Sequence, residues 1–464
     1  MSELLVEAPE GRVIPVHPLR KGELEGFIAR RGAGLKALAA AQEFTAGAGQ
    51  LLQSRRRDGA LERVLLGLGE GRDPDPMAFR ALAAGLPDGD YRIAGPAPKG
   101  APLLRAVAWG LGGYVFDRYR PKPNRRRPRL VVEEPEVLRE ARRIVHACAL
   151  ARDMTNTPAN DMGPLQVETI AREVAEAYGA AITVITGDEL LEANYPLVHA
   201  VGRAAAPHRA PRMIEIAWGE QGRPLVALCG KGVVFDSGGL DIKTAAGMRQ
   251  MKKDMGGAAH ALALGRMIMD AGMPVRLVVL LAVVENAISG DAMRPGDIIP
   301  SRKGLTVEIG NTDAEGRLIL ADALARAGEL QPEVTIDLAT LTGAARVALG
   351  PQLPPLFTDD EALAHGVEQA GREVHDPMWR LPLWKPYAEA VEADIADLRN
   401  DPDAWANAGA VTAALFLQRF APATGAWAHF DIFGWSGKAR AGWPAGAEAQ
   451  VIRALYAWLK TRFV

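Results

Sequence analysis

Leu277-Val278-Val279-Leu280-Leu281-Ala282-Val283-Val284 is the longest strongly apolar run in the chain. Eight residues are far too few to span a bilayer, which takes about 20 residues in a helix. A short run that is apolar throughout is typical of a strand buried on both faces, because a strand with one wet face alternates between apolar and polar residues. The run therefore predicts a central strand of a parallel or mixed sheet.

Strand and helix patterns alternate on both sides of this run. Strands are expected at 181–185, 213–217, 225–229 and 334–338, and helices at 164–178, 255–271, 318–329 and 411–420. Alternation of this kind predicts an α/β fold with a mixed, largely parallel central sheet flanked by helices.

The composition is that of an ordinary globular protein, with 464 residues of which 48% are hydrophobic and 24% are charged. The formal net charge of -2 predicts no strong attraction to nucleic acid or to a membrane. Cys148 and Cys229 cannot build a disulfide framework, so both are expected to be buried in a reducing compartment. The N-terminus lacks the apolar core of a signal peptide, which favours a cytoplasmic location.

The first 120 residues are less regular than the rest of the chain. Proline and a run of basic residues at 121–129 then mark an exposed boundary, and helical periodicity follows at 134–153. We expect a smaller α/β N-terminal domain at 1–130, a connecting helix at 131–155 and a C-terminal domain at 156–464. The basic run, which includes Arg125-Arg126-Arg127 and Arg129, is either a solvated linker or a contact for nucleic acid.

The segment Asn311-Thr312-Asp313-Ala314-Glu315-Gly316-Arg317-Leu318 places two carboxylates and a guanidinium within five positions. In an extended loop, alternation would direct Asp313, Glu315 and Arg317 to one side. Carboxylates held together repel each other unless a cation lies between them, which favours a metal ion. The arginine beside them could stabilise an anionic transition state. Alternatively, the segment is a polar turn that caps the helix after it.

A second polar segment follows the strand expected at 225–229. It contains Gly230-Lys231-Gly232, Asp236, Lys243 and Asp254. Ligands of open α/β sheets gather at the carboxyl ends of strands, and we expect Lys231 and Asp236 just past such an end. Asp254 precedes small residues that open a helix, so it is expected near a helix N-terminus. The phosphate-binding spacing GxxxxGK[ST] is absent, and the two lysines could equally be surface charges.

Together the two segments supply four carboxylates, Asp236, Asp254, Asp313 and Glu315. Hard divalent cations prefer oxygen ligands, and a shared set of carboxylates suits two metals that bridge a water and lower its pKa. A lysine beside two such cations would be driven toward its neutral form and could itself become a ligand. His260 could contact and support the metal ligands, or it could be a packed or solvent-facing residue of its helix.

Residues 231–239, Lys243, the segment Asp254-Met255-Gly256-Gly257-Ala258 and the octapeptide at 311–318 resemble the leucyl aminopeptidases. These are the two-metal cytosolic aminopeptidases of peptidase family M17, and the octapeptide is their signature. The similarity covers roughly residues 130–435, the family's catalytic domain. It implies a metal-dependent hydrolase that removes the N-terminal residue of peptides through a water bridging two divalent ions, manganese or zinc. It also implies a cytoplasmic homohexamer.

The resemblance further implies a role for each matched residue. One metal would be held by Lys231, Asp236, Asp254 and Glu315, and the second by Asp236, Asp313 and Glu315. Lys243 would stabilise the tetrahedral intermediate, and Arg317 would hold a bicarbonate that serves as general base. The residues lining the substrate site would be Met251, Asn311, Thr340, Leu341 and Gly343.

One segment near the C-terminus departs from the family pattern. Where the family commonly has Asp-Ile-Ala-Gly, this chain has Asp431-Ile432-Phe433-Gly434-Trp435. The small residue lines the pocket for the N-terminal side chain, so Phe433 either reshapes that pocket or turns away into the core.

Two other functions compete with peptide hydrolysis. Some relatives also bind DNA, and the arginines at 125–129 could contribute to such a role, against which the near-neutral net charge argues. A two-metal phosphoesterase would suit the carboxylates, but it would not explain the whole spaced set of residues.

Overall fold

The computed structural model describes residues 4–71, 75–95, 100–121, 127–402 and 407–464. These residues fold into two compact units. One unit comprises Met1–Ala149 with Ser436–Gly446, and the other comprises Leu150–Trp435 with Ala447–Val464. The helix expected at 134–153 is confirmed as α5 (Pro135–Asn156).

The first unit is built on a six-stranded sheet in the order β1-β6-β5-β2-β4-β3. All neighbours in this sheet are parallel except β3 and β4. Its strands are β1 (Leu5–Val6), β2 (Val13–Leu19), β3 (Leu51–Arg55), β4 (Leu61–Gly67), β5 (Gly89–Ile93) and β6 (Pro128–Val131). Its shorter helices are α1 (Leu24–Ala29), α2 (Ala33–Ala41), α3 (Arg80–Gly85) and α4 (Ala101–Gly112).

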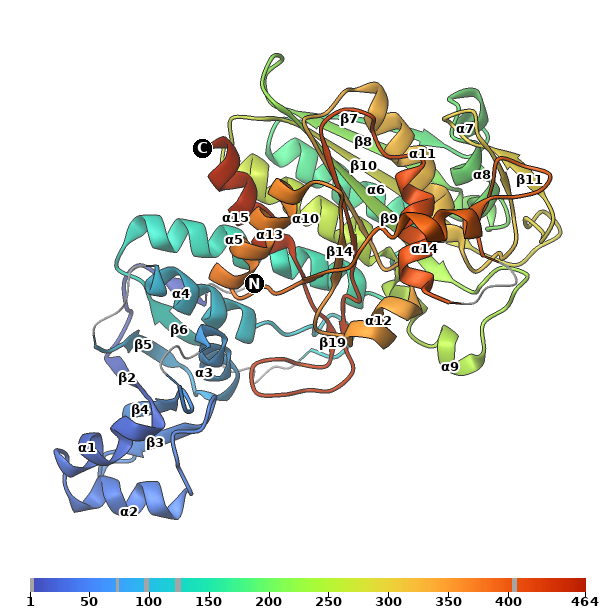
Figure 1. The fold of residues 1–464 in the computed structure, drawn as a ribbon. Coiled ribbons are helices and arrows are strands. Elements are labelled where there is room, and N and C mark those ends of the chain that lie inside the picture. The colour runs from blue at the N-terminus through green and yellow to red at the C-terminus, as the bar shows by residue number, and fades with distance from the viewer. Residues whose placement is uncertain (1–3, 72–74, 96–99, 122–126, 403–406) are drawn as a thin grey trace. The chain divides into compact units, whose positions relative to one another are not determined.

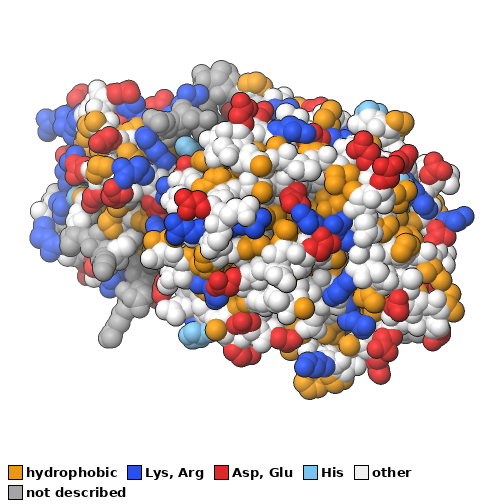
Figure 2. Space-filling model, turned by 90° about the horizontal axis from the view of Figure 1, so that it is seen from above, with side chains coloured by type: hydrophobic (Ala, Val, Ile, Leu, Met, Phe, Trp, Pro, Cys, Tyr) orange, Lys and Arg blue, Asp and Glu red, His pale blue; other side chains and the backbone are white. Residues whose placement is uncertain are grey.

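Most of the basic run at 121–129 lies outside the described residues, including Arg125 and Arg126. Arg129 is described, and it pairs with Asp90 at 2.7 Å and with Glu10. Acidic and basic side chains are interspersed over the face of the molecule shown in Figure 2. No observation on the described residues therefore favours a nucleic-acid contact.

The second unit is built on an eight-stranded sheet in the order β15-β14-β17-β13-β9-β10-β8-β7. Four central strands are parallel to one another: β17 (Ala426–Asp431), β13 (Val334–Ala339), β9 (Leu225–Asp236) and β10 (Arg276–Asn286). The outer strands are β7 (Ala181–Thr186), β8 (Arg212–Trp218), β14 (Pro355–Phe357) and β15 (Trp379–Arg380). The predicted mixed, largely parallel sheet is thus confirmed, and the apolar run at 277–284 lies fully buried in β10.

Helices cover both faces of this sheet (Figure 1). One face packs against α8 (Pro196–Gly202), α11 (Glu315–Glu329) and α14 (Gly409–Gln418), and the other against α10 (Gly256–Asp270) and α15 (Ile452–Phe463). The remaining α-helices of the unit are α6 (Pro164–Ala177), α7 (Glu189–Glu192), α9 (Ala245–Met248), α12 (Gly343–Leu349) and α13 (Glu361–Glu373). A small sheet contains β11 (Ile298–Pro300), β12 (Thr306–Glu308) and β16 (Leu398–Arg399), and β18 (Trp435–Ser436) and β19 (Gly446–Ala447) flank the segment at 436–446. No helix among the described residues is long and apolar enough to cross a membrane.

One boundary expected from the sequence is wrong, because β9 does not end at Cys229 but continues to Asp236. Lys231 therefore lies within the strand rather than beyond it. The glycines on either side serve close packing and not a turn. A Cβ on Gly230 would lie 2.6 Å from the Cα of Ala258 in α10, and one on Gly232 would lie 2.7 Å from the carbonyl oxygen of Ala282 in β10.

Candidate active site

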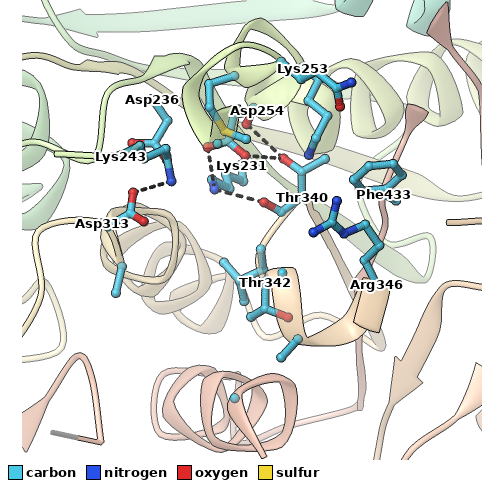
Figure 3. A pocket seen from close by; sticks show the side chains of 18 of the residues that line it. Lys231, Asp236, Lys243, Lys253, Asp254, Asp313, Thr340, Thr342, Arg346 and Phe433 are labelled. Atoms are coloured by element: carbon cyan, nitrogen blue, oxygen red, sulfur yellow. Dashed lines mark hydrogen bonds and ion pairs between the residues drawn. The ribbon is translucent and has the colours of Figure 1, made fainter. Parts of the chain in front are cut away.

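A cavity of about 580 Å³ opens where the carboxyl ends of the parallel strands meet. Asp236 ends β9, Thr340 directly follows β13, and Ile432 directly follows β17. All the site residues predicted from the sequence line this cavity except Glu315, which is buried beside Lys231. The tertiary structure thus joins segments as far apart in the chain as Lys231 and Phe433 at the edge of the sheet where α/β proteins bind ligands (Figure 3).

The carboxylates of Asp236, Asp313 and Glu315 converge, with one oxygen of each lying within 4.8 Å of the others. They come from the end of β9, the loop before α11 and the first residue of α11. The prediction that alternation in an extended loop aligns Asp313, Glu315 and Arg317 is wrong, because the last two lie in the first turn of α11. The segment is both a helix start and part of the acidic cluster.

Two lysines neutralise these acids in the structure. Lys231 Nζ lies 2.7 Å from Asp254 Oδ2 and 3.1 Å from Glu315 Oε1. Lys243 Nζ lies 2.7 Å from Asp236 Oδ2 and also pairs with Asp313. Neither lysine is therefore an ordinary surface charge.

Burial and mutual repulsion shift the pKa values of the acids. Burial, reinforced by the charge of Asp236, raises the pKa of Asp313 to about 6 and that of Glu315 well above its usual range. Burial also opposes ionisation of Asp254, but the nearby lysines, Lys231 first and then Lys253, together outweigh it and lower the pKa of Asp254. The pKa values of Lys231 and Lys243 rise because their carboxylate neighbours outweigh the burial of the ammonium groups. Such strongly shifted groups are typical of functional sites.

Two asparagines that are not among the predicted site residues support the cluster. Asn286, at the end of β10, donates to Asp236 Oδ1 at 2.9 Å and to the carbonyl of Thr312 at 3.1 Å. Asn400 accepts from Gly310 N and donates to Asn311 O, so it holds the start of the octapeptide. Their partners lie 26 to 90 positions away in the chain, so no local pattern indicated them.

Asp431 is a further residue that the sequence reasoning missed. Its Oδ1 accepts from the backbone N–H groups of Leu341 and Thr342 at 2.8 and 3.1 Å, and its Oδ2 accepts from the Thr342 hydroxyl at 2.6 Å. The carboxylate therefore fixes the loop between β13 and α12, which lines the cavity.

Phe433 lines the cavity rather than turning into the core. Lys253 Nζ lies 4.7 Å from the centre of its ring, and Arg346 Cζ lies 5.5 Å from it. His260, in contrast, is packed within α10, where its Nδ1 lies 2.6 Å from the carbonyl oxygen of Gly256 and its Nε2 accepts from Gln450 N. The structure therefore favours the alternative in which His260 is a packed residue of its helix.

Comparison with known proteins decides the family. Residues 149–456 match the model of the cytosol aminopeptidase family, catalytic domain, and residues 14–132 match that of the M17 aminopeptidase N-terminal domain. The chain belongs to the cytosol aminopeptidase family. The resemblance inferred from the sequence motifs is confirmed.

Relatives of this aminopeptidase match it over nearly its whole length. A probable cytosol aminopeptidase of Geobacter sp. (strain M21) is 38% identical over 459 residues, which cover 93% of this chain and 92% of the relative. The crystal structure of a cytosol aminopeptidase from Coxiella burnetii is 41% identical with a TM-score of 0.93, and the match covers 99% of this chain and 100% of that one. The bottromycin maturation enzyme BotP, solved in complex with Mn, is 32% identical with a TM-score of 0.86 and coverages of 98% and 100%. This protein is a metal-dependent aminopeptidase, a hydrolase that acts on peptides.

Proposed function

We propose that this aminopeptidase holds two divalent metal ions, manganese or zinc, in the carboxylate cluster of its cavity. The observation that carries the proposal is the convergence of oxygens from Asp236, Asp313 and Glu315 within 4.8 Å. These three would hold one ion, and Lys231, Asp236, Asp254 and Glu315 the other. When bound, the two ions would supply hydroxide from water and polarise the scissile carbonyl.

The chemistry of the cluster fits such ions. Both carboxylate oxygens of Glu315, Oδ2 of Asp254 and Oδ1 of Asp313 are buried, and their partners among the described residues are only the ammonium groups of the two lysines. Buried carboxylates need compensating positive charge, and free lone pairs are what an inserted cation uses. To become a ligand, Lys231 would lose a proton, so metal binding should release protons and tighten as the pH rises.

The remaining cations of the cluster would act on the substrate. Lys243 lines the cavity, so its ammonium could stabilise negative charge developing on the carbonyl oxygen of the scissile bond. Arg317 is buried, and its Nη1 donates to Asn400 O at 2.5 Å, while its Nε has no hydrogen-bond partner among the described residues. A bicarbonate acting as general base would satisfy this donor. The residues lining the substrate site would be Met251, Asn311, Thr340, Leu341, Gly343 and Phe433.

The test combines metal binding with hydrolysis of leucine p-nitroanilide. Chelation should abolish hydrolysis, added Mn²⁺ should restore it, and calorimetric titration should give two ions per chain. Glu315→Gln keeps the shape of the side chain but removes its charge, so we expect it to lose most hydrolysis and the tight binding of Mn²⁺. Glu329→Gln is the matched control, because Glu329 ends the same helix outside the cavity and pairs with Arg302. Full activity and two-ion binding in Glu315→Gln would refute the site.

The assembly and location expected from the family are part of the same proposal. A homohexamer is supported by the resemblance to the leucyl aminopeptidases, and a cytoplasmic location by the name of its relatives, cytosol aminopeptidase. Sedimentation velocity of the purified full chain tests the first, because a monomer or dimer at micromolar concentration would contradict it. Fractionation of the cells that make the protein tests the second.

A further inference from the structure

Two cations of the cavity differ from the others. Lys231 and Lys243 pair with the metal-site carboxylates, and Arg317 donates to a backbone carbonyl. The side chains of Lys253 and Arg346, in contrast, form no ion pair or hydrogen bond with any described residue, and each lies instead against Phe433. Figure 3 shows these three side chains together, across the cavity from Lys243 and Asp313.

Lys253 is the stronger evidence for an anion site, because only 6% of the residue is exposed. A buried ammonium is normally paired with an anion, since burial removes its hydration. An aromatic ring replaces only part of that hydration. Lys253, Arg346 and Phe433 all line the cavity, so an anion that enters the cavity can reach both cations.

We infer that the cavity selects peptides whose N-terminal residue carries a carboxylate, aspartate or glutamate, which Lys253 and Arg346 bind beside Phe433. The inference rests on the proposed function, which places the scissile bond at the carboxylate cluster, and on the resemblance to the family, which implies that Phe433 lies in the pocket for the first side chain. Arg346 offers the planar pair of donors that matches a carboxylate, and Lys253 adds a point charge beside the same ring. Phe433 replaces the small residue common in the family and lines the cavity beside both cations.

Isosteric substrates test the inference with Mn²⁺-reconstituted protein. Glutamate and glutamine p-nitroanilides differ in charge and hardly in shape. The ratio of their kcat/KM values therefore measures how much the negative charge of the first side chain contributes to hydrolysis. We expect a ratio of about ten or more in favour of glutamate, as for a charge-assisted hydrogen bond. Lys253→Met and Arg346→Met should each lower the ratio severalfold, and Arg346→Glu should bring it below one. Arg346 is exposed, so its variants test the inference even if Lys253→Met fails to fold.

Arg249→Met is the matched control, because Arg249 is an exposed cation near the cavity that does not line it. This variant should keep the wild-type ratio. Equal or better hydrolysis of the glutamine substrate by wild-type protein would overturn the inference, as would an unchanged ratio in both Arg346→Met and Arg346→Glu. Preference for Leu-Gly over Leu-Gly amide without discrimination between glutamate and glutamine would place the anion at the substrate's C-terminus and would also overturn it. Hydrolysis of leucine p-nitroanilide reports separately on the proposed function, because it needs no acidic side chain.

Discussion

Gly316→Ala tests whether the position of Lys231 matters for activity separately from the fold. Gly316 lies in the first turn of α11 between Glu315 and Arg317. A Cβ at this position would lie 2.6 Å from both Cδ and Nζ of Lys231 and closer still to its Cε. Ordinary contacts between such atoms are about 3.5 Å, so the lysine would have to move by roughly 1 Å.

The fold should tolerate this change while the site should not. Alanine favours a helix over glycine by about 1 kcal/mol, which offsets part of the roughly 1–3 kcal/mol that overpacking costs. Stability should therefore change by no more than about 2 kcal/mol. Lys231 is held by Asp254, Glu315 and Thr340 O. A displacement of about 1 Å at an active site can lower the rate about 100-fold, so we expect a loss of this size in Gly316→Ala.

Two measurements separate these effects. Urea unfolding of the metal-free protein gives the change in stability, and kcat/KM for leucine p-nitroanilide with saturating Mn²⁺ gives the change in activity. The control is Gly328→Ala in the same helix, where the new Cβ would meet Pro422 at an unstrained 3.5 Å. That variant should be as stable as the wild type or slightly more stable, and fully active. Wild-type activity in Gly316→Ala would refute the reasoning about Lys231.

Three further predictions follow from the packing of the second unit. Asp431→Ala should lower kcat/KM about tenfold or more by freeing the loop that the carboxylate holds, whereas Asp431→Asn, whose Oδ1 can still accept from the loop, should retain more activity in the same assay. Gly257→Ala should destabilise the protein by about 3 kcal/mol or more in urea, because its Cβ would overlap the carbonyl oxygen of Leu338. Asp337, 2.5 Å from buried His429, raises the pKa of that histidine although burial opposes this. Because the folded pKa is the higher one, the pair stabilises the protein fully below about pH 6.5 and loses this contribution as the pH rises through the folded value. His429→Gln should therefore cost more free energy of unfolding at pH 6 than at pH 9, and an equal cost at both would contradict the assignment.

The sequence was most informative where the signal is local. The apolar run at 277–284 predicted a buried central strand because burial on both faces leaves no polar positions, and β10 confirms it. The octapeptide and the segment around Asp254 predicted an acidic site because carboxylates without nearby partners need a cation. The end of β9 was wrongly placed, because Gly230 and Gly232 are typical of a turn in sequence and serve close packing in the fold.

The fold class was thus determined by the sequence alone, and so were the residue types proposed for the active site, since periodicity, charge and motif spacing are properties of neighbouring positions. The tertiary structure decided which distant residues meet. It brought Asn286 to Asp236, Asp431 to the loop after β13, and Lys253 and Arg346 to the ring of Phe433. These contacts depend on the pairing of strands and the packing of helices across 50 to 180 positions, and no local pattern specifies such pairing.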